Sequence, residues 1–148
     1  MISVLTLAVL IGSSGQPILP DHGLTPGAVL TTDSGVVCVS GYTQTVRNVP
    51  ISEKIAVEAA YHARYPQVVY AHGKQEYDHL ISLELGGSND ERNLWPEVYA
   101  DHWGAHVKDK LEKFLHAEVC SGRMTLPKAQ RLISTDWIQT YKRFLGQP

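Results

Sequence analysis

Residues 77–96 read YDHLISLELGGSNDERNLWP. One apolar segment follows Asp78 and His79, the run GGSND occupies residues 86–90, and a second apolar segment follows Asn93. Glycine, serine, asparagine and aspartate favour tight turns, so the pattern predicts two strands that reverse around residues 86–90. The reversal would bring a carboxylate, an imidazole and a carboxamide together at one end of a small sheet.

Helical periodicity flanks this stretch. A helix with one apolar face is predicted from the spacing of Val107, Leu111, Phe114, Leu115 and Val119. Further helices are predicted for residues 53–65, which Pro66 would end, and for about residues 126–145. A short strand is predicted for residues 36–46. Together these elements predict one α+β domain over residues 16–148, which is long enough for a hydrophobic core of its own.

Two histidines stand near the start of the helix that is predicted beyond Pro96. His102 and His106 are four residues apart, so they would share one face if the helix covers both. Two imidazoles at this spacing can bind one divalent metal ion, and Asp78 is the natural third ligand. A metalloprotease would need glutamate directly after the first histidine, but Trp103 stands there, which excludes that class.

The segments YDHLISLELGGSNDERNLWP and HWGAHVKDK, residues 77–96 and 102–110, resemble the HNH family of endonucleases, also called ββα-metal or His-Me finger nucleases. The resemblance covers roughly residues 76–110. It implies an α+β fold with a ββα-metal core at about residues 76–119 and flanking α-helices. It also implies hydrolysis of phosphodiester bonds in DNA, leaving 5′-phosphate and 3′-hydroxyl ends, with RNA as an alternative substrate.

The resemblance assigns roles by position. His79 corresponds to the general base that activates water, and Asp78 to a metal ligand. Asn93 corresponds to the family asparagine, which orients that histidine or braces the turn. His102 and His106 correspond to the remaining ligands of one divalent ion, for which Mg²⁺ is favoured and Mn²⁺, Ni²⁺ or Zn²⁺ are alternatives. The chain lacks the C-x-x-C pairs that hold a structural zinc in many relatives, so no such zinc is expected.

In the C-terminal third, lysine and arginine outnumber acidic residues, a pattern typical of a solvated helix face, with contacts to nucleic acid as the alternative. Lys108 and Lys110 follow the helix histidines and would contact flanking phosphates. The alternative function is a non-catalytic module that binds metal and nucleic acid on the same fold. Intact Asp78, His79 and Asn93 favour the enzyme over that alternative.

Export is indicated by two features. Residues 1–15 are mostly apolar and form a candidate signal peptide, with a buried N-terminal element as the alternative. The run is too short to span a membrane. Cys38 and Cys120 would form a disulfide in an oxidising compartment, or remain two small buried side chains in a reducing one. We therefore expect a secreted or periplasmic protein, with the cytoplasm as the alternative. The sequence does not predict the oligomeric state.

Overall fold

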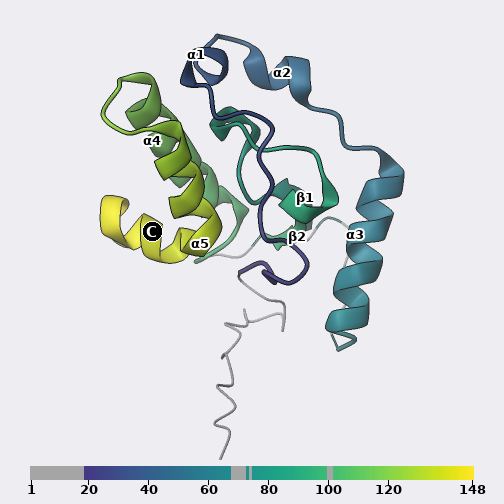
Figure 1. The fold of residues 1–148 in the computed structure, drawn as a ribbon. Coiled ribbons are helices and arrows are strands. Elements are labelled where there is room, and N and C mark those ends of the chain that lie inside the picture. Colours follow the sequence, from purple (N-terminus) through teal and green to yellow (C-terminus); the bar gives the residue numbers. More distant parts are fainter. Residues whose placement is uncertain (1–18, 68–72, 74, 100–101) are drawn as a thin grey trace, which may run out of the picture.

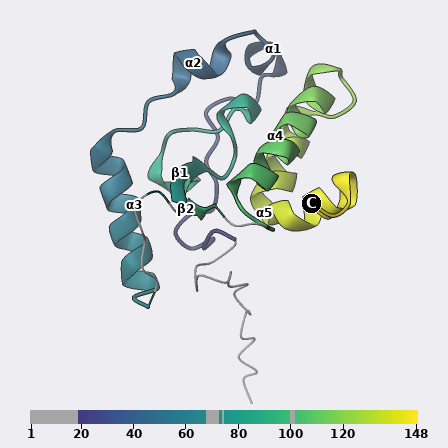
Figure 2. The ribbon, with the colours of Figure 1, turned by 180° about the vertical axis from the view of Figure 1, so that it is seen from behind.

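A two-stranded antiparallel sheet lies between helices in a computed structural model that describes residues 19–67, 73, 75–99 and 102–148. Helix α3 (Ile51–Arg64) lies on one side of the sheet, and α4 (Ala105–Cys120) and α5 (Leu126–Leu145) lie on the other (Figure 1). The view from behind shows the same arrangement (Figure 2). The described residues thus form the α+β architecture that the sequence predicts.

The sheet is a hairpin of β1 (Gln75–His79) and β2 (Leu94–Val98). Its register pairs Glu76 with Glu97, Asp78 with Trp95, and His79 with Leu94. Side chains two residues apart on a strand share a face, and directly paired residues across two strands also share one. Glu76, Asp78 and Glu97 therefore occupy one face of the sheet.

The segment between the strands is more irregular than the sequence predicts. We expected the first strand to continue through residue 85, but β1 ends at His79. The chain then forms two short 3-10 helices, η1 (Leu83–Leu85) and η2 (Glu91–Asn93), on either side of the turn. This segment contributes apolar side chains to the core instead of extending the ladder.

The larger hydrophobic cluster joins α4, α5 and η1. It includes the fully buried side chains Leu85, Leu111, Leu115, Ile133 and Trp137. The face predicted for α4 is the buried face, and α5 has the predicted bounds. Burial of apolar surface is the main favourable term in folding, so this cluster holds α4 in place against α5 and η1.

Helix α5 contains a kink at Asp136, whose backbone is non-helical (φ −161°, ψ 95°). The Asp136 Oδ1 atom accepts a hydrogen bond from the Gln139 amide at 2.9 Å, as an N-cap residue does. The side chain therefore restarts the helix after the kink, which lets α5 bend around α4.

Residues 36–46 do not form the predicted strand. They lie in two short helices, α1 (Ser34–Val37) and α2 (Tyr42–Val46). Asp33 caps α1 by accepting a hydrogen bond from the Gly35 amide, and Gly41 precedes α2 with a φ of +83°. The β-branched residues suggested a strand, but local capping and the left-handed glycine determine the conformation.

A disulfide joins Cys38, which follows α1, to Cys120 at the end of α4. The two Cα atoms lie 5.6 Å apart, and the residues are 82 positions apart in the sequence. The prediction of this pair is confirmed. A disulfide is typical of proteins in oxidising compartments, which agrees with the expected export. The candidate signal peptide lies outside the described residues, and none of the described helices is long and apolar enough to cross a membrane.

Replacing both Cys38 and Cys120 by serine is expected to lower the free energy of unfolding by roughly 4 kcal/mol, because the cross-link closes a long loop in the unfolded chain. Urea denaturation of the variant beside the oxidised protein measures this. A difference below about 1 kcal/mol would show that the bond contributes little to stability.

Candidate active site

Asn93 closes the segment between the two strands. Its side chain is fully buried and makes four hydrogen bonds to the backbone. The Oδ1 atom accepts from the amides of Ile81 at 2.9 Å and Ala28 at 3.3 Å. The Nδ2 group donates to the carbonyl oxygens of Ile81 at 2.9 Å and Ser88 at 2.8 Å. Of the two roles considered for this asparagine, the contacts correspond to bracing the turn.

Gly87 shows how tightly the turn is closed. A Cβ atom at this position would lie 1.7 Å from the Ile81 carbonyl oxygen and 2.8 Å from the Asn93 Nδ2 atom. Only glycine permits this approach of two backbone segments.

Replacing Asn93 by alanine is expected to lower the free energy of unfolding by about 3 kcal/mol, because buried backbone groups lose their partners. Urea denaturation measures the loss. Asn48→Ala, at an exposed position, is the control and should leave the midpoint almost unchanged. Equal stability of the two variants would contradict the bracing role.

His79 is the last residue of β1 and is 3% exposed. Its Nε2 atom lies 3.0 Å from Asn89 Oδ1, while Asn89 Nδ2 donates to the Val46 carbonyl oxygen at 2.7 Å. Because the Val46 carbonyl can only accept, the Asn89 amide must turn its oxygen toward the imidazole. His79 Nε2 therefore carries the proton, and Nδ1 is the basic nitrogen of the neutral ring.

Electrostatics favour that neutral ring. Burial lowers the pKa of His79 and outweighs the contact with Asn89 and the charge of Asp78, which both raise the pKa. Since the ordinary value is near 6.5, His79 is neutral at pH 7. A neutral imidazole can accept a proton.

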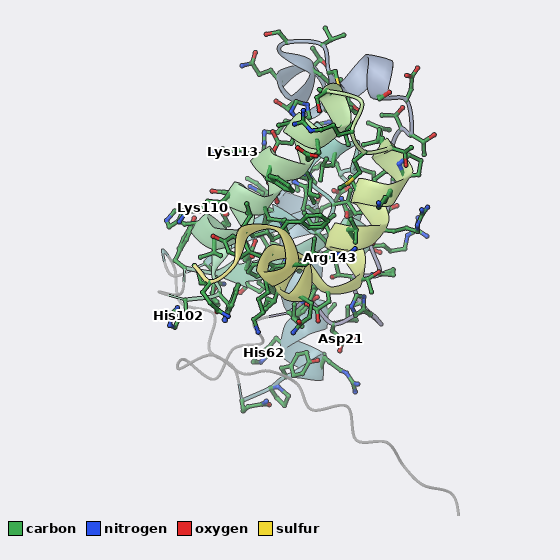
Figure 3. All side chains as sticks on the ribbon, turned by 90° about the vertical axis from the view of Figure 1, so that its left-hand side faces the viewer. Asp21, His62, His102, Lys110, Lys113 and Arg143 are labelled. Carbon is green, nitrogen blue, oxygen red and sulfur yellow. A yellow bond between two sulfur atoms is a disulfide. The ribbon has the colours of Figure 1, made fainter. Side chains whose placement is uncertain are left out.

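Lys108 is not the exposed phosphate contact that the sequence predicts. Its side chain is fully buried, and Nζ donates to Asp78 Oδ2 at 2.6 Å, Glu112 Oε1 at 2.5 Å and the His79 carbonyl oxygen at 2.8 Å. Burial lowers the pKa of Lys108, but the neighbouring carboxylates outweigh burial and place the pKa well above its usual value. An ammonium held in this way does not reach a phosphate outside the protein. Lys110 is exposed on α4 (Figure 3) and keeps that expected role as a prediction.

His102 and His106 do not join Asp78. Helix α4 begins at Ala105, so His102 precedes the helix, and both histidines are exposed. The His106 ring stacks on Tyr99, with 5.5 Å between the ring centroids. Among the described residues, groups whose ligand atoms are close enough for one ion include neither histidine.

The pair at i, i+4 that faces Asp78 is Lys108 and Glu112. Two side chains with the predicted i, i+4 spacing are therefore present on the inner face of α4, but they are Lys108 and Glu112. His106 lies in the first turn of the helix, on its outer face. The predicted ligand set of Asp78, His102 and His106 is not assembled in this structure.

The face of the sheet toward α4 instead carries three carboxylates. Ligand oxygens of Glu76, Asp78 and Glu97 all lie within 4.8 Å of one another. Glu97 is fully buried, and no donor group in the described part of the chain hydrogen-bonds to its carboxyl oxygens; the nearest counter-charge is the Lys108 ammonium at 3.9 Å. Oxygen ligands suit hard divalent cations, so this group fits a metal ion. We call Glu76, Asp78 and Glu97 the carboxylate triad.

The charges around the carboxylate triad are not balanced by Lys108. Burial raises the pKa of Asp78, but the charge of Lys108 and the hydrogen bonds with Glu97 and Lys108 together outweigh burial and leave the pKa below its usual value. Burial raises the pKa of Glu97 well above its usual value, because the charge and hydrogen bond of Asp78 and the charge of Glu112 add to burial and outweigh the attraction to Lys108. Burial also raises the pKa of Glu112 to about 8. The single ammonium of Lys108 therefore does not neutralise all of the buried carboxyl groups. The remaining carboxyl groups carry either net negative charge or bound protons.

A second group of potential ligands consists of Cys38, His116 and Cys120. Both sulfur atoms are committed to the disulfide, so this group does not offer thiolates to a metal in the oxidised protein.

Asn89, Glu97 and Glu112 are site residues that the sequence analysis missed. Glu97 could not be found by counting outward from the predicted turn, because a reversal at residues 86–90 places another residue opposite Glu76, whereas the observed register pairs Glu76 with Glu97. Glu112 stands four residues after Lys108, a spacing typical of helix ion pairs. Asn89 gave no signal, because its partner Val46 is 43 residues away.

Comparison with known proteins adds no family assignment. Searches with the sequence and the structure found no matching family model, no matching curated protein and no matching solved structure.

Proposed function

We propose that the protein is a metal-dependent endonuclease that hydrolyses phosphodiester bonds in DNA, with His79 as the general base. The observation that carries the proposal is the contact between His79 and Asn89, which leaves Nδ1 as the basic nitrogen of a neutral imidazole. The order of β1, the irregular turn, β2 and α4 supports it too, since the resemblance implies a ββα-metal core with this order.

His79 would take a proton from the attacking water at Nδ1. The resulting imidazolium keeps its Nε2–H bond to Asn89, and the charge of Asp78 stabilises the added proton. Positioned proton transfer of this kind contributes typically ~10²–10⁴ in rate. Asn89 is thus a positioning residue, and Asn93 holds the turn on which Asn89 stands.

The resemblance implies one divalent ion near Asp78, which when bound would supply Lewis-acid stabilisation of charge on the phosphate and leaving oxygen. Mg²⁺ is the favoured ion, with Mn²⁺, Ni²⁺ and Zn²⁺ as alternatives. Lys110 and the exposed Arg47, whose charge acts on His79, would contact the phosphate backbone. The disulfide supports action outside the cytoplasm, in the periplasm or after secretion.

The second candidate function is a module that binds nucleic acid without cutting it. Two observations favour it: the ammonium of Lys108 is bonded to Asp78, where the resemblance expects a metal ion, and His79 is largely buried.

The two candidates are separated by cleavage of supercoiled plasmid, single-stranded DNA and RNA, with each of the four metal ions or with EDTA. We expect metal-dependent cuts whose ends DNA ligase can rejoin, which requires 5′-phosphate and 3′-hydroxyl groups. Retarded migration of DNA in a gel without cleavage of any polymer would favour the binding module.

Asn89→Asp is expected to move the acid limb of the pH–rate profile upward by at least about one pH unit, because a carboxylate beside the imidazole favours its charged form. In the wild type the rate should rise with pH through a value below 6.5, since the pKa of His79 is lowered. NMR titration of the His79 ring gives the same information without activity. Gln139→Glu on α5 adds an equal charge as a control. An unchanged His79 titration in Asn89→Asp would contradict the assigned contact.

A further inference from the structure

We propose that the carboxylate triad of Glu76, Asp78 and Glu97 is a binding site for one hard divalent cation. The inference deepens the proposed function, since it names the ligands of the ion that the nuclease would use. It also replaces the ligand set of Asp78, His102 and His106, which the structure does not assemble.

Backbone geometry sets the site. Glu76 and Asp78 are two residues apart on β1, and Glu97 on β2 pairs directly with Glu76. Two ligands on opposite sides of one ion are separated by about 4.2 Å for Mg²⁺ and by roughly 4.6–5.2 Å for Ca²⁺, twice the metal–oxygen distance. The separation of at most 4.8 Å among the three ligand oxygens fits this range.

The burial of the Glu97 carboxyl group is a second observation that points to a bound ion. Its side chain is 1% exposed, and among the described residues no N–H or O–H donor other than a proton shared with Asp78 satisfies its buried oxygens. A buried carboxyl group left unpaired is costly, so such a group is normally satisfied by a hydrogen bond, a counter-charge or a metal ion. The ligand oxygen of Glu97 lies beside those of Glu76 and Asp78, which supply no positive charge.

Lys108 compensates Glu97 only in part. The ammonium is 2.6 Å from Asp78 Oδ2 and forms a longer ion pair of 3.9 Å with Glu97 Oε2, which is beyond hydrogen-bonding distance. Glu76 has a donor of its own, the Tyr99 hydroxyl group at 2.8 Å. The Asp78 side chain is 25% exposed, which provides an entry for an ion from solvent. Lys108 thus stands beside the site as a fixed positive charge.

The ligand chemistry predicts which ions bind. All three ligands are carboxylate oxygens, which suit Mg²⁺, Ca²⁺ and Mn²⁺, whereas Ni²⁺ and Zn²⁺ favour sites with imidazole or thiolate. We therefore expect the triad to prefer the first group of ions.

Mn²⁺ binding by the full chain after EDTA treatment and dialysis tests the inference. Electron paramagnetic resonance counts bound Mn²⁺, and competition with Mg²⁺ and Ca²⁺ gives their relative affinities. We expect one site in the wild type and at least a tenfold weaker site in Glu97→Gln, which keeps the size of the side chain but removes its charge. Glu76→Gln, at the more exposed edge, provides a second variant should Glu97→Gln fold poorly. Glu118→Gln, near the far end of α4, is the matched control and should bind as the wild type does.

Two outcomes would overturn the inference: no Mn²⁺ bound by the wild type at millimolar concentration, or equal binding by the wild type, Glu97→Gln and Glu76→Gln. The first result would mean that Lys108 and bound protons alone compensate the carboxylates, and the second would place the bound ion outside the triad. The proposed nuclease is judged separately by plasmid cleavage. Metal-dependent cleavage with unchanged binding in the variants would reject this site alone. Binding at the triad without cleavage would reject the nuclease and keep the site.

Discussion

Replacing His79 by alanine is expected to lower the rate of plasmid nicking by about 10²–10⁴-fold, because the variant loses the group that accepts the proton of the attacking water. His79 is held by Asn89 with Nε2 protonated, and burial keeps the ring neutral at pH 7. The initial rate of conversion of supercoiled to relaxed plasmid measures the effect.

Two further variants separate chemistry from folding. His79→Gln keeps most of the side-chain volume and should lose activity as alanine does, while circular dichroism shows whether each variant remains folded. His62→Ala removes an exposed histidine of α3 (Figure 3) and should nick at the wild-type rate. Nicking by folded His79→Ala at more than about one tenth of the wild-type rate would assign the base elsewhere.

Replacing Lys108 by methionine is expected to lower the free energy of unfolding by about 3–5 kcal/mol, because removing one partner of a buried ion pair leaves uncompensated charge. Methionine has a similar length, so the loss reports the ammonium more than the packing. Asp78 and Glu112 would lose a charged hydrogen bond each. Urea denaturation at pH 7 measures the change.

The loss should depend on pH. Without Lys108 the buried carboxyl groups bind protons more readily in the folded state than in the unfolded chain, so the variant should regain stability as the pH is lowered from 8 to 5. Lys110→Met, at an exposed position two residues along α4, should change stability by less than about 0.5 kcal/mol. A loss below about 1 kcal/mol in Lys108→Met at pH 7 would contradict the buried ion cluster.

The sequence predicted those features that depend on local periodicity. The apolar residues of α4 and α5 recur at helical intervals, and the burial of Leu111, Leu115 and Ile133 follows that pattern. The turn residues between Asp78 and Asn93 also have local signals, so the strand reversal was predictable. The disulfide followed from the presence of only two cysteines, once an oxidising compartment was expected.

Features that depend on tertiary position were not predictable. The spacing of His102 and His106 is the same as that of Lys108 and Glu112, and spacing alone does not say which pair faces the sheet. That choice depends on where α4 begins, at Ala105, and on the apolar contacts that orient it. The burial of Lys108 could not be read from a lysine in a charged segment, because most lysines are exposed.

The two asparagines illustrate the same limit. Asn89 and Asn93 stand four residues apart in one turn, and the sequence analysis considered only Asn93 as the residue that orients the histidine. The backbone carbonyl of Val46 turns the Asn89 amide toward His79 from a distant segment, whereas Asn93 bonds to the backbone of its own turn and of Ala28.

Plasmid nicking by the wild type and by His79→Ala, each with Mg²⁺ or EDTA, tests whether His79 is the general base of a metal-dependent nuclease. We expect that the wild type with Mg²⁺ converts supercoiled plasmid to relaxed circles, and that in the same time the variant and the EDTA samples leave nearly all of the plasmid supercoiled. Equal nicking by both proteins, or no nicking by the wild type with Mg²⁺, Mn²⁺, Ni²⁺ or Zn²⁺, would contradict the claim that His79 is the base of a metal-dependent nuclease.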